Sequence, residues 1–237
     1  MHAMCAKLVP AAVVFDAVGT LIHPEPPAAV VYAAVAQQVG SRLSLAEIRV
    51  RFRKEFERQE EIDRAAGQRT SEARERQRWR DIVGAVLDDV TDPERCFAEL
   101  FEHFSRPTAW ACTPETRSVL RELAARGHVL DLASNYDRRL QSVVAGMPEL
   151  QPIQHLIISS EIGYRKPAPE FFIAVCHALQ QPPHEILFIG DSLRNDYEGA
   201  SKAGLRALLF DPQGKASFGV PRIGRLSELL HHAEPRP

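Results

Sequence analysis

Short apolar runs recur along the chain, and a polar residue or a glycine follows most of them. The first run, Ala11–Phe15, is rich in valine and is followed by Asp16 and Gly19. A continuous apolar run of this length is typical of a strand buried on both faces of a parallel sheet. Similar runs lie at Val129–Ala133, His155–Ser159, Ile186–Ile189 and Ala207–Phe210, and helix-like stretches separate most of them. This alternation predicts an α/β fold with a doubly wound, mostly parallel sheet.

The pattern changes between Pro24 and Pro107, where strand-like runs are absent and apolar residues fall at helical spacing. The residues of this helical pattern are Leu45, Ile48, Phe52, Phe56, Trp79, Ile82, Val83 and Val86. Prolines at positions 24, 26, 27 and 107 mark the points where the chain leaves and rejoins the sheet. We therefore expect an all-helical cap domain, residues 25–106, inserted into a core of residues 1–24 and 107–237 and lying over the sheet.

Composition and charge restrict the possible partners and the location. The chain has 237 residues, of which 45% are hydrophobic, enough to bury a sizeable core. Its formal net charge of -2 gives no basic surplus, so we expect neither nucleic acid nor a membrane surface as a partner. The segment Met1 to Pro10 is too short for a secretory signal, and no apolar run approaches the ~20 residues that span a bilayer. A soluble, cytoplasmic protein is the expectation.

The cysteines give no sign of a metal site or of a disulfide framework. They are Cys5, Cys96, Cys112 and Cys176, far apart in the sequence and without the paired spacing of zinc ligands. We expect them to be reduced and mostly buried thiols.

Charged residues concentrate in the predicted helical insert, from Arg49 to Asp81, with acids and bases interleaved. This pattern is typical of solvated helix faces that neighbouring opposite charges stabilise. Alternatively, one or two of these arginines face the cleft and hold an anionic substrate. The sequence leaves open which arginines would do so.

The polar residues that follow the apolar runs are expected to meet, because ligands of open α/β sheets bind at the carboxyl ends of the strands. An aspartate ends the first run, Ser-Asn ends the second, a lysine follows the third through a short turn, and an acidic pair follows the fourth. These residues are Asp16, Ser134, Asn135, Lys166, Asp191 and Asp196. They would place a nucleophile, a hydroxyl, an ammonium and two further acids at one edge of the sheet.

This set suits phosphoryl transfer to a carboxylate, because the transferred group carries charge on three oxygens and must be held by donors, cations and a metal. Asp16 would attack and form an aspartyl-phosphate. Ser134 and backbone N–H groups would donate hydrogen bonds to the phosphate, and Lys166 would offset its charge. Asp191 and Asp196 would hold Mg²⁺, a hard cation that prefers oxygen ligands.

Each of these residues also has a structural explanation. Asp16 and Ser134 are common capping residues, and Lys166 precedes a proline and suits an exposed turn. Asp191 and Asp196 suit the cap of a helix over residues 197–203. Four such residues at four strand ends favour the functional interpretation over the structural one.

Four ordered segments resemble the motifs of the haloacid dehalogenase-like (HAD) superfamily. They are Asp16 to Leu21, Ala133-Ser134-Asn135, Lys166-Pro167, and Gly190-Asp191-Ser192 to Asp196. The predicted helical insert directly after the first motif is similar to subfamily I of that superfamily, which has a small helical cap. The motif sequences resemble its rhythmically-expressed-gene-like branch.

The resemblance covers essentially the whole chain and implies a Rossmann-like core, a Mg²⁺ cofactor and a small-molecule substrate, expected to be a phosphorylated metabolite. It implies catalysis by Asp16 and Lys166. It also implies phosphate binding by Thr20, Ser134, Asn135 and Lys166. The implied metal ligands are Asp16, the backbone carbonyl of Val18, Asp191 and Asp196.

Val18 departs from the superfamily pattern. Phosphatases of the superfamily usually carry a second aspartate at this position, which protonates the leaving alcohol and then activates water. Such acid–base help contributes ~10² to 10⁴ in rate, and a valine cannot supply it. His23 and His103 are candidate replacement acids, although a structural role is the commoner one for a histidine.

Three interpretations of this departure stay open. The first is a Mg²⁺-dependent phosphohydrolase that is slow, or that acts on substrates whose leaving group needs little protonation, such as acyl or aryl phosphates. The second is a 2-haloacid dehalogenase-like enzyme, in which Asp16 displaces a halide that leaves without a proton. The third is a catalytically weak member that binds a phosphate ligand or a protein. We favour the first, because the chain retains Asp191 and Asp196.

Overall fold

A six-stranded sheet forms the centre of the protein in a computed structural model that describes residues 9–235. Its strands are β1 Ala12–Phe15, β4 Val129–Ser134, β5 His155–Ile158, β6 Ile186–Gly190, β7 Arg206–Phe210 and β8 Arg222–Ile223. They lie in the order β5-β4-β1-β6-β7-β8, and all neighbours are parallel. The predicted α/β fold, with a doubly wound, Rossmann-like sheet, is confirmed.

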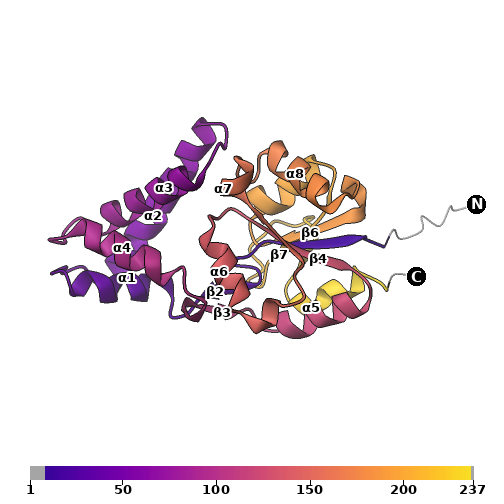
Figure 1. Cartoon of the computed structure of the whole chain (residues 1–237), viewed down its shortest axis with the longest axis horizontal. Coiled ribbons are helices and arrows are strands. Elements are labelled where there is room, and N and C mark those ends of the chain that lie inside the picture. Colours follow the sequence, from indigo (N-terminus) through magenta and orange to yellow (C-terminus); the bar gives the residue numbers. More distant parts are fainter. Residues whose placement is uncertain (1–8, 236–237) are drawn as a thin grey trace, which may run out of the picture.

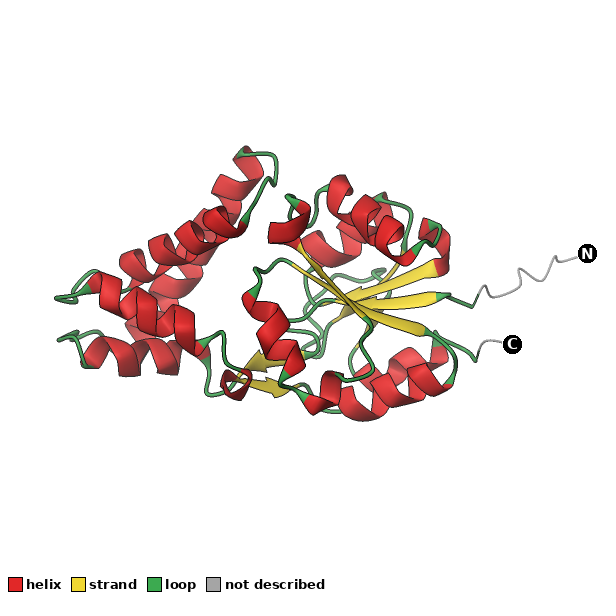
Figure 2. Cartoon of the chain, in the orientation of Figure 1, coloured by secondary structure: helices red, strands yellow, loops and turns green. Residues whose placement is uncertain are grey.

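Helices cover both faces of this sheet (Figures 1 and 2). Val13 and Phe15 of β1 belong to the apolar core that contains α5 (Thr116–Ala125) and α6 (Arg139–Ala145). Val14, between them, belongs to the opposite core, which contains α8 (Pro169–Leu179). Since successive residues of a strand point to opposite faces, burial on both faces requires the unbroken apolar run seen in the sequence. Two short helices, α7 Ser159–Ile162 and α9 Gly199–Lys202, complete this part.

Four helices lie between residues 25 and 106 of the chain. They are α1 Ala28–Gln37, α2 Leu45–Ala65, α3 Glu72–Val86 and α4 Pro93–His103, and together we call them the helical insert. They pack on an apolar core of their own that includes Ile48, Ile82 and Phe97. Figure 1 shows them beside the sheet, on the side away from the chain termini. The all-helical character is as predicted, whereas the domain boundaries at residues 24 and 107 stay a prediction.

Local sequence signals fix where these helices begin. At the start of α2, the Glu47 N–H donates to Ser44 Oγ at 3.3 Å, and the Ser44 N–H donates to the Glu47 carboxylate at 2.8 Å. This reciprocal pair is a capping box, and it satisfies two N–H groups that the helix cannot. Asp92 caps α4 by accepting the Arg95 N–H at 3.0 Å, followed by a proline in the first turn.

A two-stranded antiparallel ribbon, which the sequence pattern did not predict, joins the insert to the sheet. Its strands are β2 Ile22–Pro24 and β3 Trp110–Cys112. Each is three residues long and pairs with a segment far away in the chain. Such short runs carry no period of their own, so only the pairing defines them. β8, with two residues, was also not predicted.

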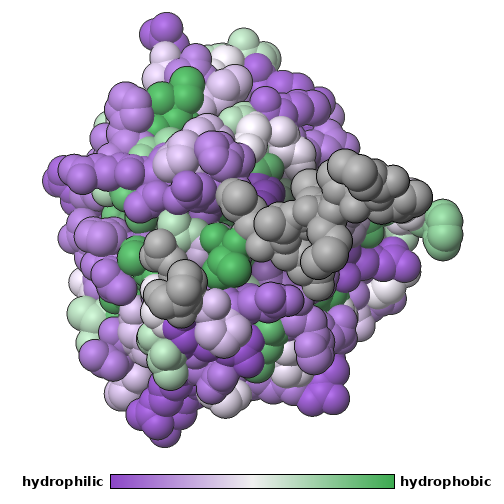
Figure 3. Space-filling model, turned by 90° about the vertical axis from the view of Figure 1, so that its right-hand side faces the viewer, coloured by the Kyte–Doolittle hydropathy of each residue, from purple (hydrophilic) through white to green (hydrophobic). Residues whose placement is uncertain are grey.

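The surface that carries the chain ends is mainly hydrophilic, with scattered hydrophobic residues (Figure 3). Cys96, Cys112 and Cys176 are free thiols, as predicted, and Cys5 lies outside the described residues. Within residues 9–235, no helix combines the length and the apolar character needed to cross a bilayer. The cytoplasmic location stays a prediction.

Candidate active site

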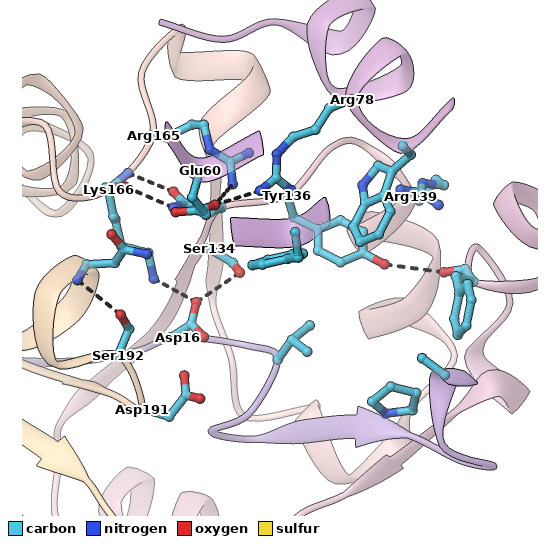
Figure 4. Close-up of a pocket in the computed structure, with 18 of the residues that line it drawn as sticks. Asp16, Glu60, Arg78, Ser134, Tyr136, Arg139, Arg165, Lys166, Asp191 and Ser192 are labelled. Atoms are coloured by element: carbon cyan, nitrogen blue, oxygen red, sulfur yellow. Dashed lines mark hydrogen bonds and ion pairs between the residues drawn. The ribbon is translucent and has the colours of Figure 1, made fainter. Parts of the chain in front are cut away.

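The polar residues predicted at the strand ends meet around one cavity (Figure 4). Asp16 follows β1 directly, and Ser134 is the last residue of β4. Ser134 Oγ donates to Asp16 Oδ1 at 2.9 Å. Lys166 comes from the loop after α7, and Asp191 and Asp196 follow β6; all three line the same cavity. The parallel sheet therefore brings together side chains as much as 180 positions apart in sequence.

The ammonium group of Lys166 lies at the centre of this set. Its Nζ donates to Asp16 Oδ1 at 2.7 Å, to Asp196 Oδ1 at 2.6 Å and to the Ala133 carbonyl at 3.1 Å. Burial opposes a charged ammonium, but the carboxylates of Asp16 and Asp196 outweigh burial and raise the pKa of Lys166 above its ordinary value. Lys166 is thus a fixed positive charge beside Asp16. Both Lys166 and Ser134 bind Oδ1 of Asp16, and Oδ2 takes part in neither bond.

Asn135 lines the cavity but is engaged by the backbone of Lys166. Its Nδ2 donates to the Lys166 carbonyl at 3.0 Å, and its Oδ1 accepts the Lys166 N–H at 2.7 Å. Both ends of the Asn135 side-chain amide therefore bind the Lys166 backbone, whereas the prediction was that Asn135 binds phosphate. Asn135 positions the segment that carries the ammonium group.

Three carboxylates at this edge offer oxygen ligands to a metal. Asp16, Asp191 and Asp196 each present an oxygen within 4.8 Å of the others. Two glycines allow this approach: a Cβ at Gly19, where φ is +93°, would collide with the Asp191 carboxylate, and one at Gly190 would collide with Asp196. Val18 lines the same cavity.

The charges of these groups fit a divalent cation. Desolvation by the surrounding residues, reinforced by the charges of Asp16 and Asp196, raises the pKa of Asp191 to about 7, although Asp191 is more exposed than either of those acids. Burial also raises the pKa of Asp196 to about 6, with Lys166 opposing this effect and Asp16 adding to it. One ammonium does not neutralise three carboxylates, and hard oxygen donors are the ligands that Mg²⁺ prefers. The residues present therefore fit Mg²⁺.

The cavity has a volume of about 440 Å³ and is bordered by both the core and the helical insert. Seven aromatic side chains also line it, and their rings contact one another in an unbroken series with centroid separations from 5.3 to 6.5 Å. We call them the aromatic belt; in contact order they are Trp79, Phe56, Phe52, Tyr32, Phe104, Trp110 and Tyr136. The sequence pattern assigned three of these rings only to packing within the insert.

A buried cluster of charges connects the insert to the loop that carries Lys166. Arg165 contacts Glu75 and lies 3.2 Å from Glu60, and Arg78 pairs with Glu60 at 2.6 Å and with Asp63 at 3.0 Å. Burial alone would raise the pKa of Glu75, but the guanidinium groups of Arg165 and Arg78 outweigh it and lower that pKa. We call these five residues the ionic cluster.

Backbone hydrogen bonds reinforce this junction. The Thr70 N–H donates to the Gly163 carbonyl at 2.9 Å, and the Arg165 N–H donates to the Gln68 carbonyl at 2.8 Å. The segment between α2 and α3 is therefore attached to the turn before Lys166. A second attachment thus exists besides the β2–β3 ribbon.

Three residues proposed for the site do not line the cavity. Thr20 is completely buried, and its Oγ1 has no hydrogen-bond partner within the described residues, so its placement gives no support to the expected phosphate contact. His23 and His103, the candidate replacement acids, are also absent from the lining. Burial and Arg106 lower the pKa of His103.

The sequence analysis missed four charged residues of the lining, namely Glu60, Arg78, Arg139 and Arg165. Arg78 is the cleft-facing arginine that the charge pattern had left open, although its partners are acids of the insert. Arg139 forms a two-pronged pair with Asp137, at 2.8 Å on each side. The position of Arg165 next to Lys166 was the one signal available, because charge interleaving alone does not show which side chains turn inward.

The family follows from comparison with known proteins. A sequence model of the haloacid dehalogenase-like hydrolases matches residues 10–204. The chain belongs to this family. The haloacid dehalogenase-like hydrolase domain-containing protein 3 of Bos taurus is 28% identical over 228 residues, which cover 92% of this chain and 90% of that protein.

Proteins similar to this chain carry the names of different enzymes. The phosphoserine phosphatase of Thermus thermophilus is 32% identical over 144 residues, 58% of this chain and 57% of that protein. The solved L-2-haloacid dehalogenase from Xanthobacter autotrophicus has a TM-score of 0.71 at 20% identity, covering 94% of this chain and 97% of that one. The predicted superfamily is confirmed, and the chain is a HAD-like hydrolase.

Proposed function

We propose that this HAD-like hydrolase is a Mg²⁺-dependent phosphohydrolase that acts through an aspartyl-phosphate on Asp16. The observation that carries the proposal is the group of three carboxylates around Lys166, within 4.8 Å of one another. Halide displacement needs no such group. Phosphoryl transfer needs cations beside both the attacking carboxylate and the phosphate oxygens, because all of these groups are negatively charged. The phosphatase relative from Thermus thermophilus supports the same class.

The residues divide the chemistry between them. Oδ2 of Asp16, which neither Lys166 nor Ser134 engages, attacks the phosphorus of a phosphate ester. Lys166 and Ser134 fix the carboxylate and donate to the phosphate oxygens, and Asn135 holds the Lys166 backbone. Asp16, the Val18 carbonyl, Asp191 and Asp196 would hold Mg²⁺, which supplies charge neutralisation for the phosphate when bound.

The expected substrate is a small phosphorylated metabolite of the cytoplasm, without nucleic acid or membrane partners. Val18 gives no proton to the leaving group, so turnover is slow unless that group leaves readily as an anion. Water then attacks the phosphorus of the aspartyl-phosphate without a second aspartate to activate it. The second step is therefore slow as well.

Dehalogenation is the second candidate, because a halide leaves without a proton and Val18 would then be no handicap. A dehalogenase has no use for the group of Asp16, Asp191 and Asp196. Desolvation and mutual repulsion make their negative charges costly without a cation. A binding protein without turnover is the remaining alternative. The observation that favours it is again the valine at position 18, where a phosphatase usually has an aspartate.

A panel of phosphate esters and 2-haloacids, each with and without Mg²⁺, separates these candidates. We expect phosphate release from p-nitrophenyl phosphate that requires Mg²⁺ and is lost in Asp16→Asn. The matched control is Asp88→Asn, because the side chain of Asp88 is 61% exposed in the insert, and this variant retains activity. Halide release without Mg²⁺ would instead establish the dehalogenase, and no release of either product would establish the binding protein.

A further inference from the structure

The aromatic belt includes partly exposed rings in the cavity wall, of which Phe52 and Phe56 also border a second, smaller hollow. Its members Phe52, Phe56 and Trp79 come from the helical insert and are only partly buried, although they lie in the cavity wall. The Arg139 guanidinium carbon lies 5.9 Å from the Trp79 ring and 5.4 Å from the Tyr136 ring, so this cation lies between the two ends of the series. Partly buried rings around a cavity of about 440 Å³ suit a flat, apolar ligand group.

The cations of the cavity wall leave no free partner for a second anionic group on the ligand. Arg78 and Arg165 are paired within the ionic cluster, and Arg139 is paired with Asp137. A ligand with a carboxylate beside its phosphate would have to displace one of these acids. The charges of these three guanidinium groups are therefore compensated within the protein, although Arg165 Nε has no hydrogen-bond partner among the described residues.

Apart from the acids proposed to hold Mg²⁺, the described part of the lining offers no evident proton donor for the leaving group. Position 18 is valine, and His23 and His103 lie elsewhere. Oε1 of Glu60 accepts hydrogen bonds from both Arg78 and Arg165. Tyr136 Oη donates to the Phe104 carbonyl at 3.4 Å, and burial raises the pKa of this phenol, which makes it a poorer acid.

These observations select the same ligand, and we propose that the protein binds and hydrolyses phosphate monoesters of phenols, with the aryl ring inside the aromatic belt. The proposal rests on the proposed function and names its substrate class. Among substrates whose leaving group needs little protonation, the belt favours aryl phosphates over acyl phosphates. A phenol also leaves as a stabilised anion, so the missing acid at position 18 costs least for this class.

The steps balance without a further reactant. Asp16 Oδ2 forms a bond to phosphorus, and the bond between phosphorus and the aryl oxygen breaks, so that the electron pair leaves with the phenolate. The phenolate takes a proton from solvent. Water then attacks phosphorus, the bond to Asp16 breaks, inorganic phosphate leaves, and the proton of the water goes to solvent.

The test measures ligand binding apart from turnover. Phenylphosphonate and cyclohexylphosphonate have rings of the same atom count, but only the first is flat and aromatic. We expect calorimetry with the full chain and Mg²⁺ to show about tenfold tighter binding of phenylphosphonate, the size of an aromatic pair contribution. Trp79→Leu and Phe56→Leu should remove this preference. Phe101→Leu should keep it, because Phe101 is also an aromatic residue of the insert but does not line the cavity.

The outcomes separate this inference from the proposed function. Equal binding of the two phosphonates, or binding of neither, overturns the inference. Hydrolysis of phenyl phosphate and of an alkyl phosphate of matched leaving-group acidity at equal rates overturns it too, while leaving the phosphohydrolase intact. Selective phenylphosphonate binding without hydrolysis of phenyl phosphate supports the aryl site and refutes the phosphohydrolase. Faster hydrolysis of a phosphotyrosine peptide than of free phosphotyrosine would overturn the expectation that the aryl phosphate is a small molecule.

Discussion

In the proposed phosphohydrolase mechanism, residue 18 limits the rate. The cavity wall holds the proposed nucleophile Asp16, the ammonium of Lys166 and two further acids of the carboxylate group, but position 18 is a valine. Val18 lines the cavity that contains Asp16, so a carboxylate at this position is expected close to the reacting groups. The change Val18→Asp is therefore a direct test of what is missing.

We predict that Val18→Asp raises the rate of phosphate release from alkyl phosphates by ~10² or more, since general acid–base help is worth that much. For p-nitrophenyl phosphate the gain is smaller, because that leaving group needs little protonation. Steady-state kinetics on both esters provide the measurement. Equal gains on both, or none on the alkyl ester, would show that leaving-group protonation is not the limitation; Val18→Leu is the control for side-chain size.

If Asp191 holds Mg²⁺ as proposed, its raised pKa would make metal binding depend on pH. A carboxyl group with a pKa near 7 is stabilised in its protonated form, so the metal-free protein loses stability as the pH rises toward that value. Mg²⁺ binds the carboxylate and competes with protons below that pH.

We predict that Mg²⁺ raises the melting temperature more at pH 8 than at pH 6. Each pH unit below about 7 should weaken Mg²⁺ binding up to tenfold, about 1.4 kcal/mol of ligand stabilisation. Thermal unfolding with Mg²⁺ or EDTA at both values measures this. In Asp191→Asn, Mg²⁺ should no longer raise the melting temperature at either pH. A shift of the same size at pH 6 and pH 8 in the unaltered protein would contradict the assigned role.

At the scale of elements, the ionic cluster attaches the helical insert to the loop of Lys166. Its members come from α2, α3 and the turn before Lys166, and Arg78, Arg165, Asp63 and Glu75 are all buried. Buried charges are costly unless they are paired, so removing one partner leaves another uncompensated.

We predict that Glu75→Leu lowers the free energy of unfolding by about 3–5 kcal/mol, the cost of breaking a buried ion pair. The control is Glu94→Leu, because Glu94 pairs with Arg80 while its side chain is 67% exposed, and such pairs contribute about 1 kcal/mol or less. Urea unfolding of both variants gives the comparison. Equal small losses would mean that the cluster does not hold the insert in place.

Patterns within single elements predicted most of the fold. Each of the five predicted strands is found with a difference of a single residue at one end, because burial on both faces leaves a continuous apolar run. The β2–β3 ribbon escaped prediction, since its pairing joins segments about 90 residues apart. Phe52, Phe56 and Trp79 fell in the helical pattern, but periodicity does not distinguish a ring in the insert core from one in a cavity wall.

At the scale of the whole molecule, the site depends on how the insert sits against the sheet. The residues that meet at the strand ends belong to the sheet and its loops and not to the insert; they are Asp16, Ser134, Lys166, Asp191 and Asp196. Their meeting was predictable from the order of the strands along the chain. Phe52, Phe56 and Trp79 of the aromatic belt come from the helical insert, as does the cleft-facing Arg78, so their position at the cavity requires the structure. Thr20 shows the limit of transfer by motif, because it is fully buried away from the cavity lining.

The covalent intermediate tests the central claim most directly. Without an aspartate at position 18 to activate water, the aspartyl-phosphate should persist, so mixing with p-nitrophenyl phosphate and Mg²⁺ should give a burst of nitrophenol. Acid quenching followed by peptide mass spectrometry should then find one phosphoryl group on Asp16, and none when EDTA replaces Mg²⁺. Nitrophenol release without any phosphoryl group on Asp16, or with the group on another residue, would contradict the mechanism.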